Sequence, residues 1–173
     1  MDTPVTANAP LLRADALQID AGARALVREL SFELRAGEFL AVLGRNGSGK
    51  SLTLHTLAGL RRPAAGTLRC GARAVAELGR RAIARHVGLL PQDREDTLPL
   101  TALESALIGR NPHLRPWQAS GAGDEALARE ALARFGVGAH AARAIHTLSG
   151  GEQRRAAMAA LLTQQPRVYL LDE

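Results

Sequence analysis

The chain contains few of the residue types on which metal, disulfide and base-stacking chemistry depend. Its 173 residues include one cysteine, and aromatic residues make up only 3%. The lone Cys70 cannot form a disulfide within the chain, and the five histidines show none of the spacings typical of a zinc site. Although the net charge is +5, the arginines are scattered and side chains for base stacking are scarce. We therefore expect neither a histidine or cysteine metal site nor nucleic acid as a partner.

Long apolar segments are also absent. No run approaches the roughly 18 residues that span a bilayer, and the first residues, Met1-Asp2-Thr3-Pro4, lack the basic and apolar parts of a signal peptide. A hydrophobic content of 46% is enough for a domain of this length to bury a substantial core. The sequence predicts a single soluble domain that remains in the cytoplasm.

Lysine is nearly absent, and its one position is informative. Of the 22 basic residues 21 are arginine, and the single lysine is Lys50, in the run Gly44-Arg45-Asn46-Gly47-Ser48-Gly49-Lys50-Ser51. This run matches the pattern G-x-x-x-x-G-K-[ST], in which backbone N–H groups surround the α- and β-phosphates, the lysine reaches the β- and γ-phosphates and the serine holds Mg²⁺. Residues 44–51, the phosphate loop, therefore predict a nucleoside triphosphate site.

The residues around the phosphate loop have the pattern that such a loop requires. The apolar run Phe39-Leu40-Ala41-Val42-Leu43 precedes it and predicts a parallel strand buried on both faces. Leu52, Leu54 and Leu57 follow it at helical spacing. We expect a strand, the loop and then a helix whose N-terminus faces the phosphates.

The rest of the pattern alternates strands with helices. Strands are predicted as two β-runs within residues 11–34 around a turn at Ala21-Gly22, and at residues 66–69, 86–90 and 168–171. Helices are predicted at residues 78–85, 101–108, 124–135 and 149–165. The chain divides into a β-rich and phosphate-loop core (1–92), a helical subdomain (93–147), and a final helix and strand (148–173).

Three further motifs identify a family. Leu148-Ser149-Gly150-Gly151-Glu152-Gln153 resembles the signature motif of ABC-type ATPases, and its Ser149 and Glu152 also form a helix capping box, S-x-x-E. Gln92, directly after a core strand and Pro91, resembles the Q-loop glutamine. Asp172 and Glu173 end an apolar strand, as the Walker B acidic pair does. The resemblance implies an α/β P-loop NTPase fold, an ABC-type ATP-binding cassette with a central, mainly parallel sheet, a β-rich N-terminal part and a helical subdomain.

The resemblance also implies roles for individual residues, with ATP and Mg²⁺ as cofactors. Ser51, Gln92 and Asp172 are expected to hold Mg²⁺. Lys50, Gln92 and Glu173 are expected to act in hydrolysis, with Glu173 polarising the attacking water. The residues expected to bind the nucleotide are Gly44, Arg45, Asn46, Gly47, Ser48, Gly49, Lys50, Ser51 and Leu52 of one chain, and Ser149, Gly150, Gly151 and Glu152 of a second copy in a homodimer.

Two features depart from the family pattern. Ala21 occupies the position where such ATPases usually carry an aromatic residue that stacks on adenine. The sequence also stops at Glu173, before the D-loop, the next strand and the switch histidine of the family. We therefore expect the complete protein to hydrolyse ATP and this 173-residue chain not to do so.

Within the family, residues 51–60 and 107–113 resemble ATPases of importers for large metal chelates. Cobalamin is the first choice of cargo, followed by haem and ferric siderophores. The implied partners are a second ATP-binding subunit, membrane permease subunits and, indirectly, a periplasmic or extracellular substrate-binding protein. The chain would then lie peripherally on the cytoplasmic face of the inner membrane.

Two alternatives remain open at this point. One is a non-transport ABC ATPase that acts on DNA or ribosomes. The DNA-repair type needs room for long coiled coils between Gln92 and Ser149, and only 56 residues lie between them. The other alternative is a nucleotide-binding remnant without turnover, which phosphate release would distinguish from an enzyme.

Overall fold

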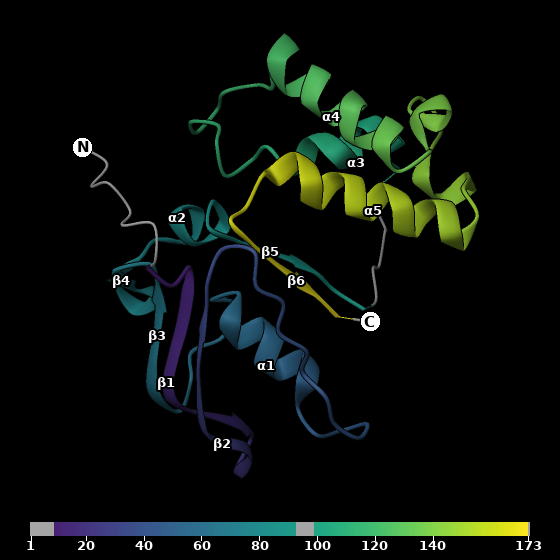
Figure 1. The fold of residues 1–173 in the computed structure, drawn as a ribbon. Coiled ribbons are helices and arrows are strands. Elements are labelled where there is room, and N and C mark those ends of the chain that lie inside the picture. The colour runs from purple at the N-terminus through teal and green to yellow at the C-terminus, as the bar shows by residue number, and fades with distance from the viewer. Residues whose placement is uncertain (1–8, 93–98, 173) are drawn as a thin grey trace.

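The computed structural model describes residues 9–92 and 99–172 (Figure 1). Strands form two sheets. The larger sheet is antiparallel, with the order β2-β1-β3-β4, and the smaller sheet is a parallel pair of β5 and β6. The strands are β1 (Leu12–Ala21), β2 (Arg24–Leu34), β3 (Ala65–Cys70), β4 (Arg73–Ala74), β5 (Val87–Leu90) and β6 (Val168–Leu171). The β-runs predicted within residues 11–34 and the strands predicted at 66–69, 86–90 and 168–171 are confirmed.

Five α-helices lie in the described residues, and each of the predicted helices is present with slightly different ends. They are α1 (Lys50–Leu57), α2 (Arg80–Ala84), α3 (Ala102–Ile108), α4 (Ala122–Arg134) and α5 (Gly150–Gln164), with short 3₁₀ turns at Val75–Glu77, Gly138–His140 and Ile145–Thr147. In Figure 1, α3, α4 and α5 gather on one side of the β5–β6 pair, and α1 lies on its other side. None of the described helices is long and apolar enough to cross a membrane.

Small side chains let α3, α4 and α5 pack closely into what we call the helical layer. Its core is rich in alanine, and Leu132, Val137 and Ile145 are almost completely buried in it. A Cβ atom added at Gly109 would come within 2.2 Å of the Ala160 carbonyl oxygen, so the chain approaches α5 there more closely than any side chain allows. The described helices of the segment 93–147 therefore pack together with α5 around one core.

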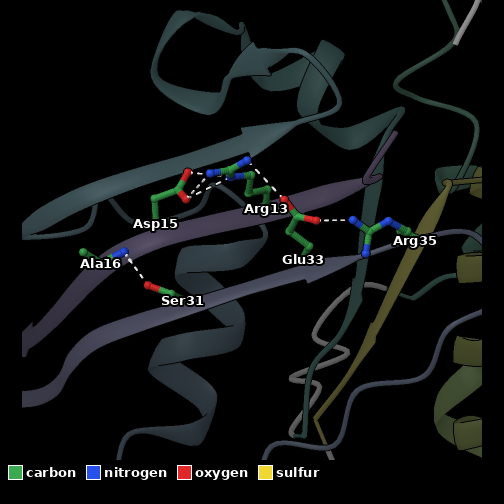
Figure 2. Close-up of polar contacts among 6 residues, drawn as sticks. All are labelled: Arg13, Asp15, Ala16, Ser31, Glu33 and Arg35. Carbon is green, nitrogen blue, oxygen red and sulfur yellow. Dashed lines mark hydrogen bonds and ion pairs between the residues drawn. The ribbon is translucent and has the colours of Figure 1, made fainter. Parts of the chain in front are cut away.

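Apolar and charged residues alternate along β1, so the antiparallel sheet has one buried face and one exposed face. Leu12, Ala14, Leu17 and Ile19 of β1 are buried, and the opposite face carries a row of charges. Figure 2 shows this row, in which Arg13 pairs with Asp15 and Glu33, and Glu33 also pairs with Arg35. Such exposed pairs contribute little stability, but opposite charges on neighbouring strands favour this register.

A bulge interrupts the pairing of β1 with β2 next to the charged row. Ala16 adopts a left-handed backbone conformation with φ of 47°, and its N–H donates to the Ser31 hydroxyl at 2.9 Å, as drawn in Figure 2. On its other side β1 pairs with β3, and only glycine fits at residue 66 beside the bulge. A Cβ atom there would lie 2.3 Å from the Ala16 carbonyl oxygen.

The prediction of a strand at residues 39–43 is wrong. No regular element forms there, and Phe39 and Leu43 are 91% and 90% exposed. A strand requires a hydrogen-bonded neighbour, and residues 39–43 pair with none of the described strands, since the parallel sheet consists of β5 and β6 alone. A hollow of about 600 Å³ lies between residues 39–42 and β6. An apolar run alone therefore did not suffice to form a strand.

Candidate nucleotide site

The phosphate loop leads into α1 in a conformation that depends on its glycines. Gly47 and Gly49 have positive φ angles of 76° and 98°, and Gly49 is the N-cap of α1. A Cβ atom at Gly49 would also lie 3.2 Å from Leu26 of β2. Glycine is therefore required at position 49 both by the backbone angle and by the close approach of β2.

The start of α1 differs from the starts of α3 and α5. No side chain caps α1, and its first turn contains no acidic residue. By contrast, Thr101 with Glu104 caps α3, and Ser149 with Glu152 caps α5. The first N–H groups of a helix need acceptors, and the helix dipole favours an anion there. The uncapped start of α1 is therefore suited to a phosphate group.

Lys50 is half-buried and folds back over the phosphate loop. Its ammonium group donates to the carbonyl oxygens of Gly44 at 3.0 Å and Arg45 at 3.4 Å. These acceptors are part of the loop itself, so the positive charge is held directly at the loop. Lys50 is thus positioned to neutralise phosphate charge at the start of α1.

Gln92 lies beside the phosphate loop. It follows β5 and Pro91 directly. A hollow of about 420 Å³ is lined by Gln92 together with Leu26, Asn46, Gly47, Gly49, Lys50, Ser51 and Leu52. Residues far apart in the sequence therefore share one concave surface, which is large enough for part of a nucleotide.

Asp172 lies at the carboxyl end of β6, on the side of the sheet where such folds bind ligands. The residue is 4% exposed, and its N–H donates to the Leu90 carbonyl at 2.9 Å, which continues the β5–β6 pairing by one residue. Asp172 and Lys50 both line the hollow of about 600 Å³. Glu173, for which we predict a role in hydrolysis, lies outside the described residues.

The predicted signature residues lie at the start of α5, where Ser149, Gly150 and Gly151 are exposed and Glu152 is half-buried, and these residues line neither hollow. The Ser149 hydroxyl and backbone N–H donate to Glu152 Oε2, each at 2.7 Å. These bonds lower the pKa of the Glu152 carboxyl, because they stabilise its ionised form. His140 also pairs with Glu152, at 3.2 Å. The motif is therefore a preformed helix start, separate from the phosphate loop of the same chain.

The donors present fit Mg²⁺ and ATP. Ser51, Gln92 and Asp172 provide a hydroxyl, an amide and a carboxylate oxygen, which are the ligand types that Mg²⁺ prefers. Among the described residues no group of three or more His, Cys, Asp or Glu could hold a metal ion. Ser51 and Gln92 line the smaller hollow and Asp172 lines the larger one, while Lys50 lines both. These donors suit Mg²⁺, because this ion is often held by one or two protein oxygens together with phosphate oxygens.

Sequence reasoning missed one residue of this site. Leu26 of β2 lines the smaller hollow beside the loop, although the alternating pattern of β2 gave no sign of it. Ala21, at the position where the family usually stacks an aromatic residue on adenine, is exposed and does not line this hollow. No aromatic side chain is among the lining residues. Leu26 and Leu52 are therefore the apolar side chains available there.

Comparison with known proteins decides the family. The profile of the ABC transporter family matches residues 27–173. The chain belongs to the ABC transporter family, as an ATP-binding domain. It is 38% identical to a hemin import ATP-binding protein of Gloeobacter violaceus over 170 residues, which cover 94% of this chain and 61% of that protein. It is 34% identical to a cobalamin import ATP-binding protein of Halobacterium salinarum over 157 residues, which cover 91% of this chain and 39% of that protein.

A solved structure agrees with the ABC assignment of the fold. An inward-facing metal-chelate type ABC transporter superimposes with a TM-score of 0.80 at 28% identity, covering 95% of this chain and 60% of that one. The predicted ABC-type α/β fold is therefore confirmed. The chain spans about 60% of the length of that structure and of the hemin relative.

Proposed function

We propose that this chain is the nucleotide-binding part of an ATPase subunit that powers an ABC importer. The observation that carries the proposal is the shared hollow, which is lined by the uncapped start of α1, Lys50 and Gln92. An uncapped helix start with a lysine beside it is a site for the phosphates of ATP. Relatives named for hemin and cobalamin import support the transport role.

Each residue of the site has a distinct part in this proposal. The N–H groups at the start of α1 and the Lys50 ammonium bind the phosphates, and Ser51, Gln92 and Asp172 hold Mg²⁺. When bound there, Mg²⁺ would supply positive charge against the phosphates. Glu173 orients the attacking water. This chemistry requires mainly positioned charge and an oriented nucleophile, and these side chains supply both.

The proposal includes a homodimer on a membrane permease. The start of α5 does not line either hollow of its own chain, which supports the proposal that Ser149, Gly150, Gly151 and Glu152 bind the nucleotide of a second copy. The two glycines are exposed, and their N–H groups begin a helix. The subunit would lie on the cytoplasmic face of the membrane, against permease subunits that receive cargo from a substrate-binding protein.

We propose a large metal chelate as the cargo, with cobalamin, haem and ferric siderophores as the candidates. The support comes from the names of the relatives and of the superimposed metal-chelate transporter. The nucleotide site itself carries no information on cargo, because the transported molecule does not contact it. Uptake measured with each chelate in turn would distinguish the candidates.

A second candidate is nucleotide binding without turnover by the 173-residue chain. The observation that favours it is the open hollow between residues 39–42 and β6, which separates the segment before the phosphate loop from Asp172. Hydrolysis requires the loop and the acidic residues to be held in fixed relative positions. Release of phosphate by the 173-residue chain would exclude this candidate.

The proposed function is tested most sharply by Glu173→Gln in the whole protein. This change keeps the size of the side chain and removes the group that orients water, so ATP should be bound and not cleaved. We expect light scattering to show a dimer that persists with Mg-ATP, and phosphate release to fall at least about 100-fold. The matched control is Glu130→Gln on the exposed face of α4, which should hydrolyse ATP normally. Wild-type turnover by the Glu173 variant would contradict the role of Glu173.

A further inference from the structure

The side chain of Arg154 connects three parts of the molecule that meet at the nucleotide site. Arg154 lies on α5, one turn after the capping box, and it is half-buried. Its Nη1 donates to the carbonyl oxygens of Pro91 at 3.0 Å and Gln92 at 3.4 Å, and its Nη2 donates to that of Asp172 at 3.4 Å. One guanidinium therefore joins α5 to the residues that follow β5 and β6.

The parallel pairing of β5 and β6 explains how one side chain can reach both strand ends. Leu90 is aligned with Leu171, so the carboxyl ends of the two strands are adjacent. Figure 1 shows α5 lying along this pair of strands, and its Ala157 and Leu161 pack with Leu90 in one apolar cluster. This packing places Arg154 over the edge of the sheet at which Gln92 and Asp172 emerge.

Arginine is suited to this position for geometric reasons. Its planar guanidinium presents several N–H groups in a fixed fork, and it remains charged at any ordinary pH. Lysine has the same charge but donates from a single atom, so it cannot hold the same separated carbonyls in one fixed arrangement. Among the described residues, the hydrogen-bond partners of Arg154 are all backbone carbonyls.

We propose that Arg154 is a positioning residue that fixes the backbone of Gln92 and Asp172 relative to the start of α5. The inference rests on the proposed function, in which Gln92 and Asp172 hold Mg²⁺ and the start of α5 binds a second copy's nucleotide. Arg154 itself lines neither hollow. Arg154 joins the strand ends that carry Gln92 and Asp172 to α5. Binding of Mg²⁺ and nucleotide at the strand ends therefore alters the backbone at residues 149–151.

Gln164 provides a matched control within the same helix. Its side-chain amide donates to the carbonyl oxygens of Ala84 at 2.6 Å and Val87 at 3.3 Å, at the opposite end of β5. Arg154 and Gln164 thus both attach α5 to backbone carbonyls around β5, and only Arg154 does so at the nucleotide end. Loss of either bond should affect stability, whereas only the loss of Arg154 should affect the response to Mg²⁺.

The test measures the affinity of the 173-residue chain for ATP by calorimetry, with Mg²⁺ and with EDTA. The dissociation constant in EDTA divided by that in Mg²⁺ measures how much Mg²⁺ strengthens ATP binding, and so reports how well Gln92 and Asp172 are positioned. ATP binding in EDTA depends on the phosphate loop. In Arg154→Ala this ratio should fall about tenfold, as expected for the loss of hydrogen bonds from a charged group, with the EDTA affinity changed less than about threefold. Gln164→Ala should keep the wild-type ratio.

A second variant and a second readout separate positioning from a merely structural role. Arg154→Lys keeps the charge, so a loss of the Mg²⁺ effect in this variant too would be due to the fork geometry. Hydrogen exchange should show that Mg-ATP slows the amides of residues 150–153 in the wild type and in Gln164→Ala, and does not do so in either Arg154 variant. An unchanged Mg²⁺ ratio in Arg154→Lys and Arg154→Ala, or an equal loss in Gln164→Ala, would overturn the inference alone. A wild-type chain that binds no ATP would overturn the proposed function as well.

Discussion

The helical layer buries its apolar side chains against itself, whereas residues 39–43 leave theirs against an open hollow. Leu132 of α4 is completely buried, and Phe39 is 91% exposed. The two regions also differ in their helix starts, because α5 begins with a capping box and α1 begins without a cap. The capping box of α5 satisfies backbone groups at the start of that helix, whereas a strand at residues 39–43 would need hydrogen bonds from a neighbouring strand. The phosphate-loop region is thus built around groups that require an external partner.

The largest expected effect on stability comes from a substitution in the packed helical layer. Leu132→Ala removes a completely buried side chain from the helical layer and should lower the free energy of unfolding by about 2–5 kcal/mol. Urea unfolding followed by circular dichroism measures the change. A loss below about 1 kcal/mol would show that the layer is not a packed core.

An intermediate effect should follow the charge of Glu152. Its pKa is lowered by the bonds from Ser149, so its contribution to stability is present above the ordinary pKa of a glutamate and is lost as the pH falls through the lowered value. The stability difference between wild type and Glu152→Gln should therefore shrink as the pH is lowered from 6 to about 3. Urea midpoints across this range measure it.

Glu130→Gln on α4 is the control for the pH experiment, because Glu130 makes one exposed ion pair and no helix cap. Its difference from wild type should be small at every pH. A difference in stability between wild type and Glu152→Gln that stays constant over the whole pH range would contradict the account of the capped helix start.

The smallest expected effect on stability comes from a substitution in the exposed segment 39–43. Phe39→Ala should change the free energy of unfolding of the 173-residue chain by less than about 0.5 kcal/mol, since the ring is almost fully exposed. The same urea measurement checks it. A loss as large as that of Leu132→Ala would mean that residues 39–43 are packed in solution and that the comparison between the two regions fails.

The sequence predicted the elements that depend on local contacts. The S-x-x-E pattern at Ser149 and Glu152 predicts the start of α5, and the helical spacing after the phosphate loop predicts α1. In both cases the residues that determine the structure lie within a few positions of one another. Gln92 and five residues of the phosphate loop line one hollow.

The parts that could not be predicted depend on distant contacts. The run from Phe39 to Leu43 has the composition of a buried strand, but composition does not show whether a neighbouring strand is available. Leu26 reaches the site only because β2 lies against Gly49, and Arg154 reaches it only because β5 and β6 end side by side. No local pattern contains this information.

Calorimetry of ATP binding to the wild type and to Lys50→Ala tests the central claim most directly. Lys50 is the only lysine in the chain, and the claim is that its ammonium group and the uncapped start of α1 form the phosphate site. Lys50→Ala should weaken Mg-ATP binding at least about 100-fold, while Arg129→Ala, an exposed cation of α4, should bind like the wild type. Equal affinity of the wild type and Lys50→Ala would contradict the account.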